Sequence, residues 1–429
     1  MARSLQPGSI IFRFLQFFLR MAVTHSNIRH LAVKRFVARS ISLAAKPIYN
    51  WRVYDSMNIV SISHEDRRLQ DSLNGCILGM AVGDAVGLVC EGLTPARQRK
   101  LYSVIDGPRL IGRRGMISDD TEHICLAAEA LIASAGDIEL FERQLARGLR
   151  GWFLAGPAGI GWATLRSCMM LCVGIPPAQS GVYPAGNGPA MRSAILGAAY
   201  GSDPGRLVKL VRACTRITHT DPKAEAGALA VAVAAAVAAL QLPHTKIADI
   251  YRERWAQAIA LTHPDVRSAA AELTTLLERA IGCAQKGQGT ADFVASIDTS
   301  HTRGISGYIY RTVPAAIHAW LSHPGNVRSA VLEVVHCGGD TDTTGAITGA
   351  IVGAGVGREG IPDSWIASLW EWPRNAGWMA ELGEQLSDVI DKGLLQQPPS
   401  VPFAACLIRN AIFAVIVIGQ ALRHYLPPY

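Results

Sequence analysis

The chain is organised around one short segment, His336-Cys-Gly-Gly-Asp-Thr-Asp-Thr-Thr-Gly-Ala346, which crowds two carboxylates and three hydroxyls onto one turn. Asp340 and Asp342 are two residues apart, so a tight turn can aim both at one point. Burying two like charges is costly unless a cation or a proton compensates them. Gly338 and Gly339 remove the Cβ atoms that would keep other backbone away from such a centre. An acidic helix start is the simpler alternative, which this segment alone leaves open.

A second segment far upstream has the same composition: Gly115-Met-Ile-Ser-Asp-Asp-Thr-Glu122. Adjacent carboxylates flanked by hydroxyls again open an apolar helix, whose buried stripe has helical spacing. We expect the two acidic helix starts to converge from separate parts of the chain. Together they offer only hard oxygen ligands, which suit Mg²⁺, Mn²⁺ or Ca²⁺ and not zinc. Four carboxylates in one place fit a two-metal centre better than a single ion.

Composition predicts a helical protein with ample core. Of 429 residues, 49% are hydrophobic and only 17% are charged, so the chain forms either two domains or one large helical domain with tails. The nine cysteines include no C-x-x-C pair. This pattern indicates free thiols in a reducing cytoplasm, not a disulfide framework or a zinc site.

The basic charge is concentrated at the N-terminus. Residues 1–60 hold nine Lys or Arg and one acid, a net charge of 9 − 1 = +8, so the remaining chain carries 7 − 8 = −1. The basic balance therefore gives no indication of nucleic-acid binding. We expect residues 1–65 to form a poorly ordered extension. Targeting or surface binding through Ile10–Val23, and a true start at Met57, are the alternatives.

The main domain is expected at residues 66–397 and to be all-α, because few segments alternate with the period of a strand. Its first helix, Arg67–Glu91, repeats glycine every four residues, so a neighbouring helix can approach closely. Asp84 is the lone charge on this glycine-rich half, where it is either functional or a hydrogen-bond hub for a neighbouring loop. Glu91 stands where an irregular flap begins.

Three further candidates lie on loops. The segment Pro184-Ala-Gly-Asn-Gly-Pro-Ala-Met-Arg-Ser193 has strong turn chemistry, and its backbone N–H groups are suited to phosphate oxygens. Arg192 adds a cation there, with a salt-bridged surface arginine as the alternative. His219 is either a ligand contact or a capping or core histidine. Tyr308 lies on a glycine-framed loop from which it can stack on a base.

The tail, residues 398–429, is predicted to be an apolar helix. Pro398-Pro399 interrupts the chain, and the following apolar run is long enough to span a membrane, which takes about 20 residues. Arg409 and Asn410 fall inside that run. Docking on the domain, docking on a partner and lying at a membrane surface therefore stay open beside crossing. Membrane association through this tail is the alternative to a purely cytoplasmic protein.

Five motifs taken together resemble the ADP-ribosylglycohydrolase family, which includes the dinitrogenase reductase-activating glycohydrolase. They occur in family order over about two thirds of the chain, from Asp71 to Gly355. The motifs are the Gly75–Gly87 repeat with Asp84 and Glu91, Ser118-Asp-Asp-Thr121, Gly186-Asn-Gly-Pro-Ala-Met-Arg192, Thr218-His219 and Gly338-Gly-Asp-Thr-Asp-Thr343.

The resemblance implies an all-α fold, two Mg²⁺ ions (or Mn²⁺), and hydrolysis of the bond between ADP-ribose and a protein side chain. The metal ligands carried over by position are Ser118, Asp119, Asp120, Asp340, Asp342 and Thr343. The family usually has threonine where this chain has Ser118, which keeps the oxygen but loses the methyl group. Glu91 would sit on a mobile flap, and the residues that would help bind ADP-ribose are Asn187, Arg192, His219 and Tyr308.

A catalytic hypothesis follows from these positions. Asp119 or Asp120 would orient or activate the attacking water, with Glu91 as gate or proton carrier. The alternatives are hydrolysis of small ADP-ribose derivatives and a non-catalytic ADP-ribose-binding module. A membrane-associated structural protein driven by the tails would leave the paired acidic motifs unexplained.

Overall fold

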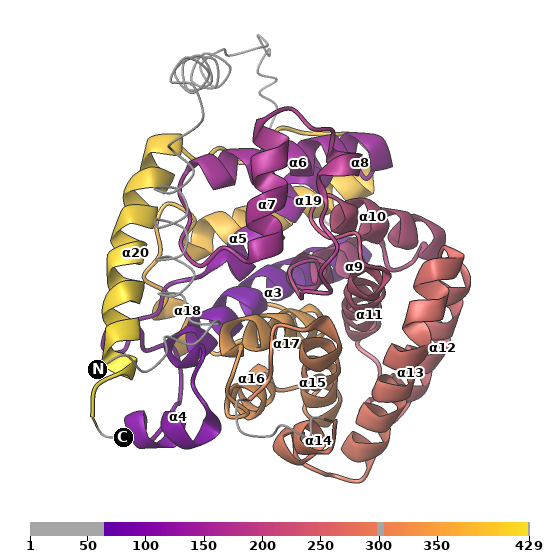
Figure 1. Ribbon diagram of the computed structural model, residues 1–429. Helices are drawn as coiled ribbons and strands as arrows, with labels where there is room; N and C mark the ends of the chain where they lie inside the picture. Colours follow the sequence, from indigo (N-terminus) through magenta and orange to yellow (C-terminus); the bar gives the residue numbers. More distant parts are fainter. Residues whose placement is uncertain (1–63, 298–303, 428–429) are drawn as a thin grey trace. The chain divides into compact units, whose positions relative to one another are not determined.

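The computed structural model describes residues 64–297 and 304–427. These residues fall in one compact unit, His64–Tyr429. The expectations about residues 1–63, including Ile10–Val23 and Met57, lie outside the described residues. The described residues are drawn in colour in Figure 1.

The core of this unit is a pair of helices in direct backbone contact. Glycines of α3 (His64–Gly87) face glycines of α17 (Thr341–Val356), and a Cβ atom on any of them would overlap a carbonyl oxygen of the other helix. The facing pairs are Gly75 with Gly353, Gly79 with Gly349, and Gly83 with Gly345. The close neighbour expected from the glycine repeat is thereby confirmed.

The order of these pairs makes the two helices antiparallel. The C-terminal end of α3 therefore meets the start of α17, where Thr341 Oγ1 donates a hydrogen bond to the Gly87 carbonyl at 2.7 Å. This contact brings the acidic turn at Asp340–Asp342 beside the short helix η2 (Leu88–Cys90) and the Glu91 flap. Figure 1 shows α3 running between α17 on one side and α5 (Asp119–Ile132) on the other.

The other helices cover this centre. In chain order they are α4 (Pro95–Leu101), α6 (Ile138–Leu154), α7 (Trp162–Cys172), α8 (Pro177–Ser180), η3 (Ala190–Arg192), α9 (Ala194–Tyr200), α10 (Pro204–Arg216), α11 (Pro222–Ala239), α12 (His244–Ala260), α13 (Pro264–Gln285), α14 (Thr290–Ile297), α15 (Ile309–Ser322), α16 (Val327–Val335), α18 (Asp363–Ala367), α19 (Ala376–Lys392) and α20 (Phe403–His424). The described residues pair as strands only in isolated bridges. The predicted all-α class is confirmed.

The helical segment that follows residues 184–189 is in two pieces. The chain forms the short turn η3, passes through Ser193 and then enters α9. The Ser193 hydroxyl donates to the Pro189 carbonyl at 2.7 Å. This bond ties the turn to the preceding segment Gly186–Gly188, called the glycine loop below. The interruption fixes that loop on the bundle instead of leaving it free.

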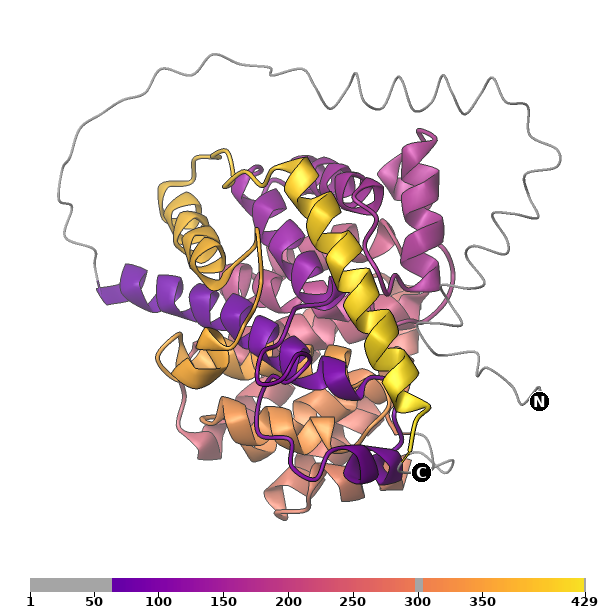
Figure 2. The same ribbon diagram turned by 90° about the vertical axis from the view of Figure 1, so that its left-hand side faces the viewer.

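The C-terminal helix α20 lies along one side of the bundle, facing the viewer in Figure 2. Arg409 and Asn410, the two polar residues inside its apolar run, point into the protein. The Asn410 amide donates to the Ala155 carbonyl at 2.9 Å, and the Arg409 guanidinium pairs with Glu371 at 2.7 Å. The tail helix therefore docks on the domain.

Candidate active site

The two acid-rich segments meet. Thr343 Oγ1 at the start of α17 donates to Asp120 Oδ2 at the start of α5 at 3.1 Å, across 223 residues of sequence. Ser118, the N-cap of α5, contacts the same carboxylate at 3.2 Å. Both acidic pairs lie at helix starts, where exposed N–H groups favour negative charge. The convergence expected from the sequence is confirmed.

Asp120 and Asp342 are buried beside other acids. Burial raises the pKa of Asp120 and Asp342 well above the usual aspartate value, and neighbouring acids raise both further. Asp119 and Asp340 act on Asp120 in this way, and Glu91 and Asp340 act on Asp342. The pKa of Asp119 is raised for the same reasons, with burial first. The five acids therefore share one electrostatic environment.

Asp84 is the hydrogen-bond hub that orients the start of α5. Its Oδ2 atom accepts bonds from the Ser118 N–H at 2.8 Å, the Thr121 N–H at 3.2 Å and the Thr121 hydroxyl at 2.5 Å. Burial raises the Asp84 pKa to about 6, although these donors act in the opposite direction. The hub reading of Asp84 is confirmed, and it links α3 directly to the acidic segment.

A cation would suit this donor set. One side-chain oxygen in each of Asp84, Asp120 and Asp342 is buried without a hydrogen-bond partner. These orphan oxygens lie with the hydroxyls of Ser118 and Thr343, and hard oxygens of this kind fit Mg²⁺ or Mn²⁺. Among the described residues, no group of three or more His, Cys, Asp or Glu side chains is placed to hold an ion in the positions seen here.

The flap is tied to the acidic turn through its backbone. The Gly92 N–H donates to the Gly339 carbonyl at 2.7 Å, and the Gly339 N–H donates back to Leu93 at 2.8 Å. These two bonds hold the residues that follow Glu91 against Gly339. Glu91 is close enough to both acidic segments to raise the pKa of Asp119 and of Asp342.

The loop at residues 305–307 links the acidic turn to the glycine loop. The Asp340 N–H donates to the Ile305 carbonyl at 2.8 Å, and the Asn187 N–H donates to the Gly307 carbonyl at 3.1 Å. The Asn187 side chain then donates to Asp340 Oδ2 at 2.7 Å. Gly339 has φ +85°, and a Cβ atom on it would overlap the Ile305 carbonyl. The structure thus brings Asn187 to the acids.

Arg192 lies behind the glycine loop. Its side chain is fully buried, and it donates to the carbonyls of Gly188 at 3.1 Å and Cys214 at 3.0 Å and to the Thr218 hydroxyl. The alternative of a salt-bridged surface arginine is therefore wrong. The local sequence could not show this, because one of the bonding partners of Arg192, Cys214, comes from α10. Its guanidinium supports that loop through the Gly188 carbonyl.

His219 is a neutral imidazole beneath the same loop. Its Nδ1 contacts the Thr218 hydroxyl at 2.9 Å, and the other face of the ring lies under Gly186 and Gly188. A Cβ atom on either glycine would come within 3.1 Å of the ring. Burial, aided by the positive charge of Arg192, lowers the His219 pKa to about 3.

Tyr308 lies beside the glycine loop and is half-buried. It forms an isolated bridge with Gly186, and its hydroxyl contacts Lys223 Nζ at 3.1 Å. Lys223 also pairs with Glu272 at 2.6 Å. The aromatic ring is thereby fixed beside the glycine loop.

Sequence reasoning missed a buried ionic network behind α5. The Glu122 carboxylate accepts hydrogen bonds from Trp152 at 2.7 Å and Arg374 at 3.1 Å, and Arg409 and Glu371 form a second pair beside it. Glu122 belongs to the acidic motif, but its partners come from α6, the segment before α19, and α20. The only sequence signal was a charge placed inside the apolar run of α20.

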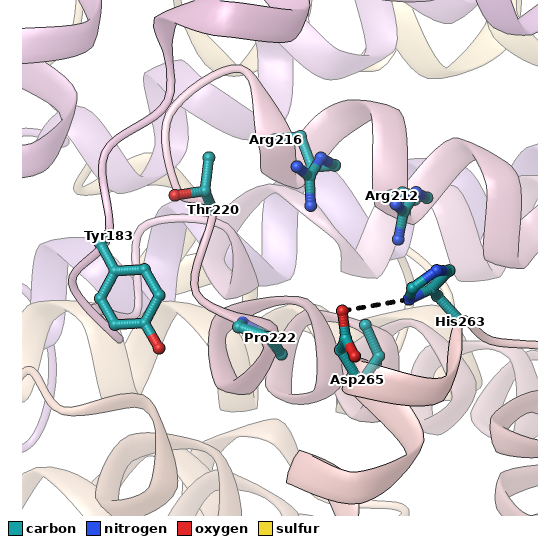
Figure 3. Close-up of a pocket in the computed structure, with 8 residues that line it drawn as sticks. Tyr183, Arg212, Arg216, Thr220, Pro222, His263 and Asp265 are labelled. Carbon is teal, nitrogen blue, oxygen red and sulfur yellow. Dashed lines mark ion pairs between the residues drawn. The ribbon is translucent and has the colours of Figure 1, made fainter.

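A cavity of about 540 Å³ is lined by residues of α10, of the segment that follows it and of the start of α13 (Figure 3). Its lining includes Tyr183, Arg216 and Thr220. Arg212 and His263 also line it, paired respectively with Glu225 at 3.1 Å and Asp265 at 3.3 Å. None of the predicted site residues lines this cavity, so it is separate from the acids.

Comparison with known proteins matches the geometry. The family description ADP-ribosylglycohydrolase fits residues 65–395. The ADP-ribosyl-[dinitrogen reductase] glycohydrolase of Rhodospirillum rubrum is 27% identical, over 70% of this chain and 91% of its own. The ADP-ribosylhydrolase ARH3 of Gallus gallus is 27% identical, over 68% and 87%. A solved structure described as an ADP-ribosylglycohydrolase-related protein complex has 26% identity and a TM-score of 0.54, covering 76% of this chain and 99% of that one.

Proposed function

The chain belongs to the ADP-ribosylglycohydrolase family and is a hydrolase of glycosidic bonds, and from this premise we propose that it removes ADP-ribose from a modified protein side chain in a reaction that depends on Mg²⁺. The relatives named above act, by their names, on ADP-ribosyl groups, one of them on an ADP-ribosylated protein. Mn²⁺ is the alternative ion.

The observation that carries the metal dependence is the meeting of Asp120 and Thr343 beside carboxylate oxygens without donors. An isolated acidic helix cap would not bury several carboxylates against each other. The residues that would hold the ions are Ser118, Asp119, Asp120, Asp340, Asp342 and Thr343. When bound, two such ions supply a fixed positive charge that orients sugar hydroxyls and lowers the pKa of water.

The protein groups divide the remaining work. Departure of the leaving group builds positive charge at the anomeric carbon, so nearby carboxylates favour that transition state. Asp119 or Asp120 orients the attacking water and takes its proton as general base. Glu91, on the flap, gates the site or carries the proton toward the leaving group.

The glycine loop and the residues around it would hold the diphosphate and the base of ADP-ribose. Backbone N–H groups around Gly186–Gly188 suit the diphosphate, and Arg192 and neutral His219 hold that loop in place. Asn187, which contacts Asp340, stands between the acids and the loop. Tyr308 beside the loop offers a ring face for stacking.

The decisive experiment compares release of ADP-ribose by the unsubstituted chain, Asp120→Ala and Asp342→Ala, with Mg²⁺ and with a chelator. ADP-ribosyl-arginine and ADP-ribosyl-serine peptides and O-acetyl-ADP-ribose form the substrate panel. We expect both variants to lose at least about 100-fold in kcat. Asp363→Ala, whose side chain is 86% exposed at a remote surface, is the matched control.

Full activity of either active-site variant, or full activity in chelator, would refute the metal-dependent assignment. Turnover of O-acetyl-ADP-ribose without any release from peptides would move the substrate to small ADP-ribose derivatives. Because the described cysteines are all free, we also propose a cytoplasmic location.

A further inference from the structure

The C-terminal helix α20 lies on the protein surface, but its polar side chains face the protein and its apolar side chains face outward. Its hydrogen-bonding side chains point inward: Gln420 donates to the Val89 carbonyl at 3.3 Å, and His424 contacts the same carbonyl at 3.0 Å. Its outward face is apolar. The family match ends at residue 395, before this helix begins. Membership of the family therefore gives no reason for the helix.

The outward face of α20 is continuous. Every exposed residue between Phe403 and Leu422 is apolar, and Val415 is 71% exposed. The large members, spaced along one side of the helix, are Phe403, Leu407, Ile408, Ile412, Val415 and Leu422. Singly exposed apolar residues are ordinary, but a face of this length marks a site of interaction. Figure 2 shows α20 in front of the described bundle, uncovered by any other described helix.

Burial separates α20 from other apolar helices of the protein. Three described helices are long and apolar enough to cross a membrane. Two are interior elements: Arg68–Cys90 is fully buried and Pro222–Ala239 is 78% buried. Phe403–His424 is only 33% buried. The apolar character of the first two is explained by the core, and that of α20 is not.

The inward contacts hold α20 on the domain and oppose crossing. The Arg409 guanidinium forms two bonds with Glu371, at 2.7 and 2.8 Å, and donates to the Ile117 carbonyl. Crossing a bilayer would move Arg409 into hydrocarbon and leave Glu371 buried without a cation. The helix therefore suits a position in the plane of a lipid surface, with only its outer side inserted.

The surroundings of this face match a lipid interface. Trp370 and Trp372, which flank Glu371, are 47% and 53% exposed, and amphipathic aromatic rings favour the level of lipid headgroups. The C-terminal end of α20 brings Arg423 near the exposed Arg99 and Lys100 of α4, because Arg97 donates to the His424 carbonyl at 2.8 Å. Positive charge at that end complements anionic headgroups.

We propose that the outer face of α20 docks the enzyme on an anionic lipid bilayer, with the helix lying in the interface. A protein partner or a second copy fits less well, because protein interfaces carry about one hydrogen bond per 100–200 Å² and this face offers no side chain for one. Stable membrane attachment takes an apolar element together with a basic one. The chain has both, since residues 1–60 add a net charge of 9 − 1 = +8.

The test is sedimentation of the full chain with vesicles of phosphatidylcholine and phosphatidylserine. The variant Ile412→Ser/Val415→Ser makes the middle of the outer face polar. Val173→Ser/Leu261→Ser is the matched control, because it removes similarly exposed apolar side chains from other parts of the surface (72% and 53% exposed). We expect the α20 variant to bind about tenfold more weakly and the control to bind unchanged. Unaltered melting temperatures check that both variants fold.

Three results would overturn the proposal. The first is vesicle binding that Ile412→Ser/Val415→Ser leaves undiminished, since the basic extension alone would then explain it. The second is a soluble dimer that this variant separates while the unsubstituted chain ignores vesicles, which would assign the face to a second copy. The third is protein that stays in the membrane after alkaline carbonate extraction, which would indicate a spanning helix. The outcome is independent of which glycosidic bond the enzyme cleaves.

Discussion

At the scale of single residues, the buried carboxylates would make the proposed metal binding depend on pH. In the absence of metal, burial holds the pKa values of Asp119, Asp120 and Asp342 well above their unfolded value of about 4. Their contribution to stability is therefore present below that value and is lost as pH rises through the raised pKa values. An ion must displace the protons that these carboxylates retain. It therefore stabilises the protein most at high pH, where the protons have already dissociated.

We accordingly predict that the increase in melting temperature caused by Mg²⁺ is small near about pH 5 and grows toward about pH 8. Differential scanning calorimetry with and without MgCl₂ measures it. Buried histidines such as His219 titrate in both samples, so the difference between the two curves cancels them. A Mg²⁺ effect that shrinks as pH rises would contradict the prediction.

Single residues also show how far the sequence could be read. Asp119, Asp120, Asp340 and Asp342 were recognisable, because their chemistry lies in contiguous motifs. Arg192 was also a candidate, but its buried position was not predictable, because its bonds to Cys214 and Thr218 depend on the path of α10. Arg409 looked like an interruption of an apolar run until Glu371 supplied its partner.

At the scale of helices, the contact between α3 and α17 depends on the absence of side chains. We predict that Gly79→Ala or Gly349→Ala lowers the free energy of unfolding by about 3 kcal/mol or more, because the added Cβ meets backbone that cannot move aside. Urea denaturation followed by circular dichroism gives the value. Gly282→Ala in α13 is the control: nothing lies within 4 Å of its Cβ, so it should be neutral or stabilising by up to about 1 kcal/mol.

The same spacing explains the limit of prediction at this scale. Glycines four residues apart in α3 required a close neighbour, and those at 345, 349 and 353 have the matching spacing. The sequence did not predict that the glycines of α3 face those of α17, because either helix could have packed on the Ala-rich α11. Register and direction follow only when the whole bundle is assembled.

The ion pair that docks α20 gives a second prediction for helices. Arg409→Met should destabilise the protein by about 3–5 kcal/mol, because it leaves the Glu371 carboxylate buried and unpaired. Arg409→Met/Glu371→Gln should recover part of that loss, since it removes the unpaired charge. Equal unfolding free energies for the single and the double variant would show that the pair has no such role.

At the scale of the whole molecule, the candidate site is a junction between parts of the chain that are remote in sequence. Asp120 and Thr343 are in contact across 223 residues, and the flap, the acidic turn and the glycine loop are joined in series by backbone hydrogen bonds. An ion at the junction would act as a crosslink that closes several long loops at once. Its effect should therefore spread beyond its own ligands.

Hydrogen–deuterium exchange can detect this crosslink. We predict that Mg²⁺ slows amide exchange in peptides covering 117–121 and 338–344 together, and that Asp120→Ala abolishes the protection of both, although 338–344 is unchanged in that variant. Asp363→Ala, remote from the junction, should retain the protection of both peptides. Protection confined to one peptide would mean that each acidic helix start takes up ions independently. The shared centre, and with it the proposed metal-dependent chemistry, would then have to be given up.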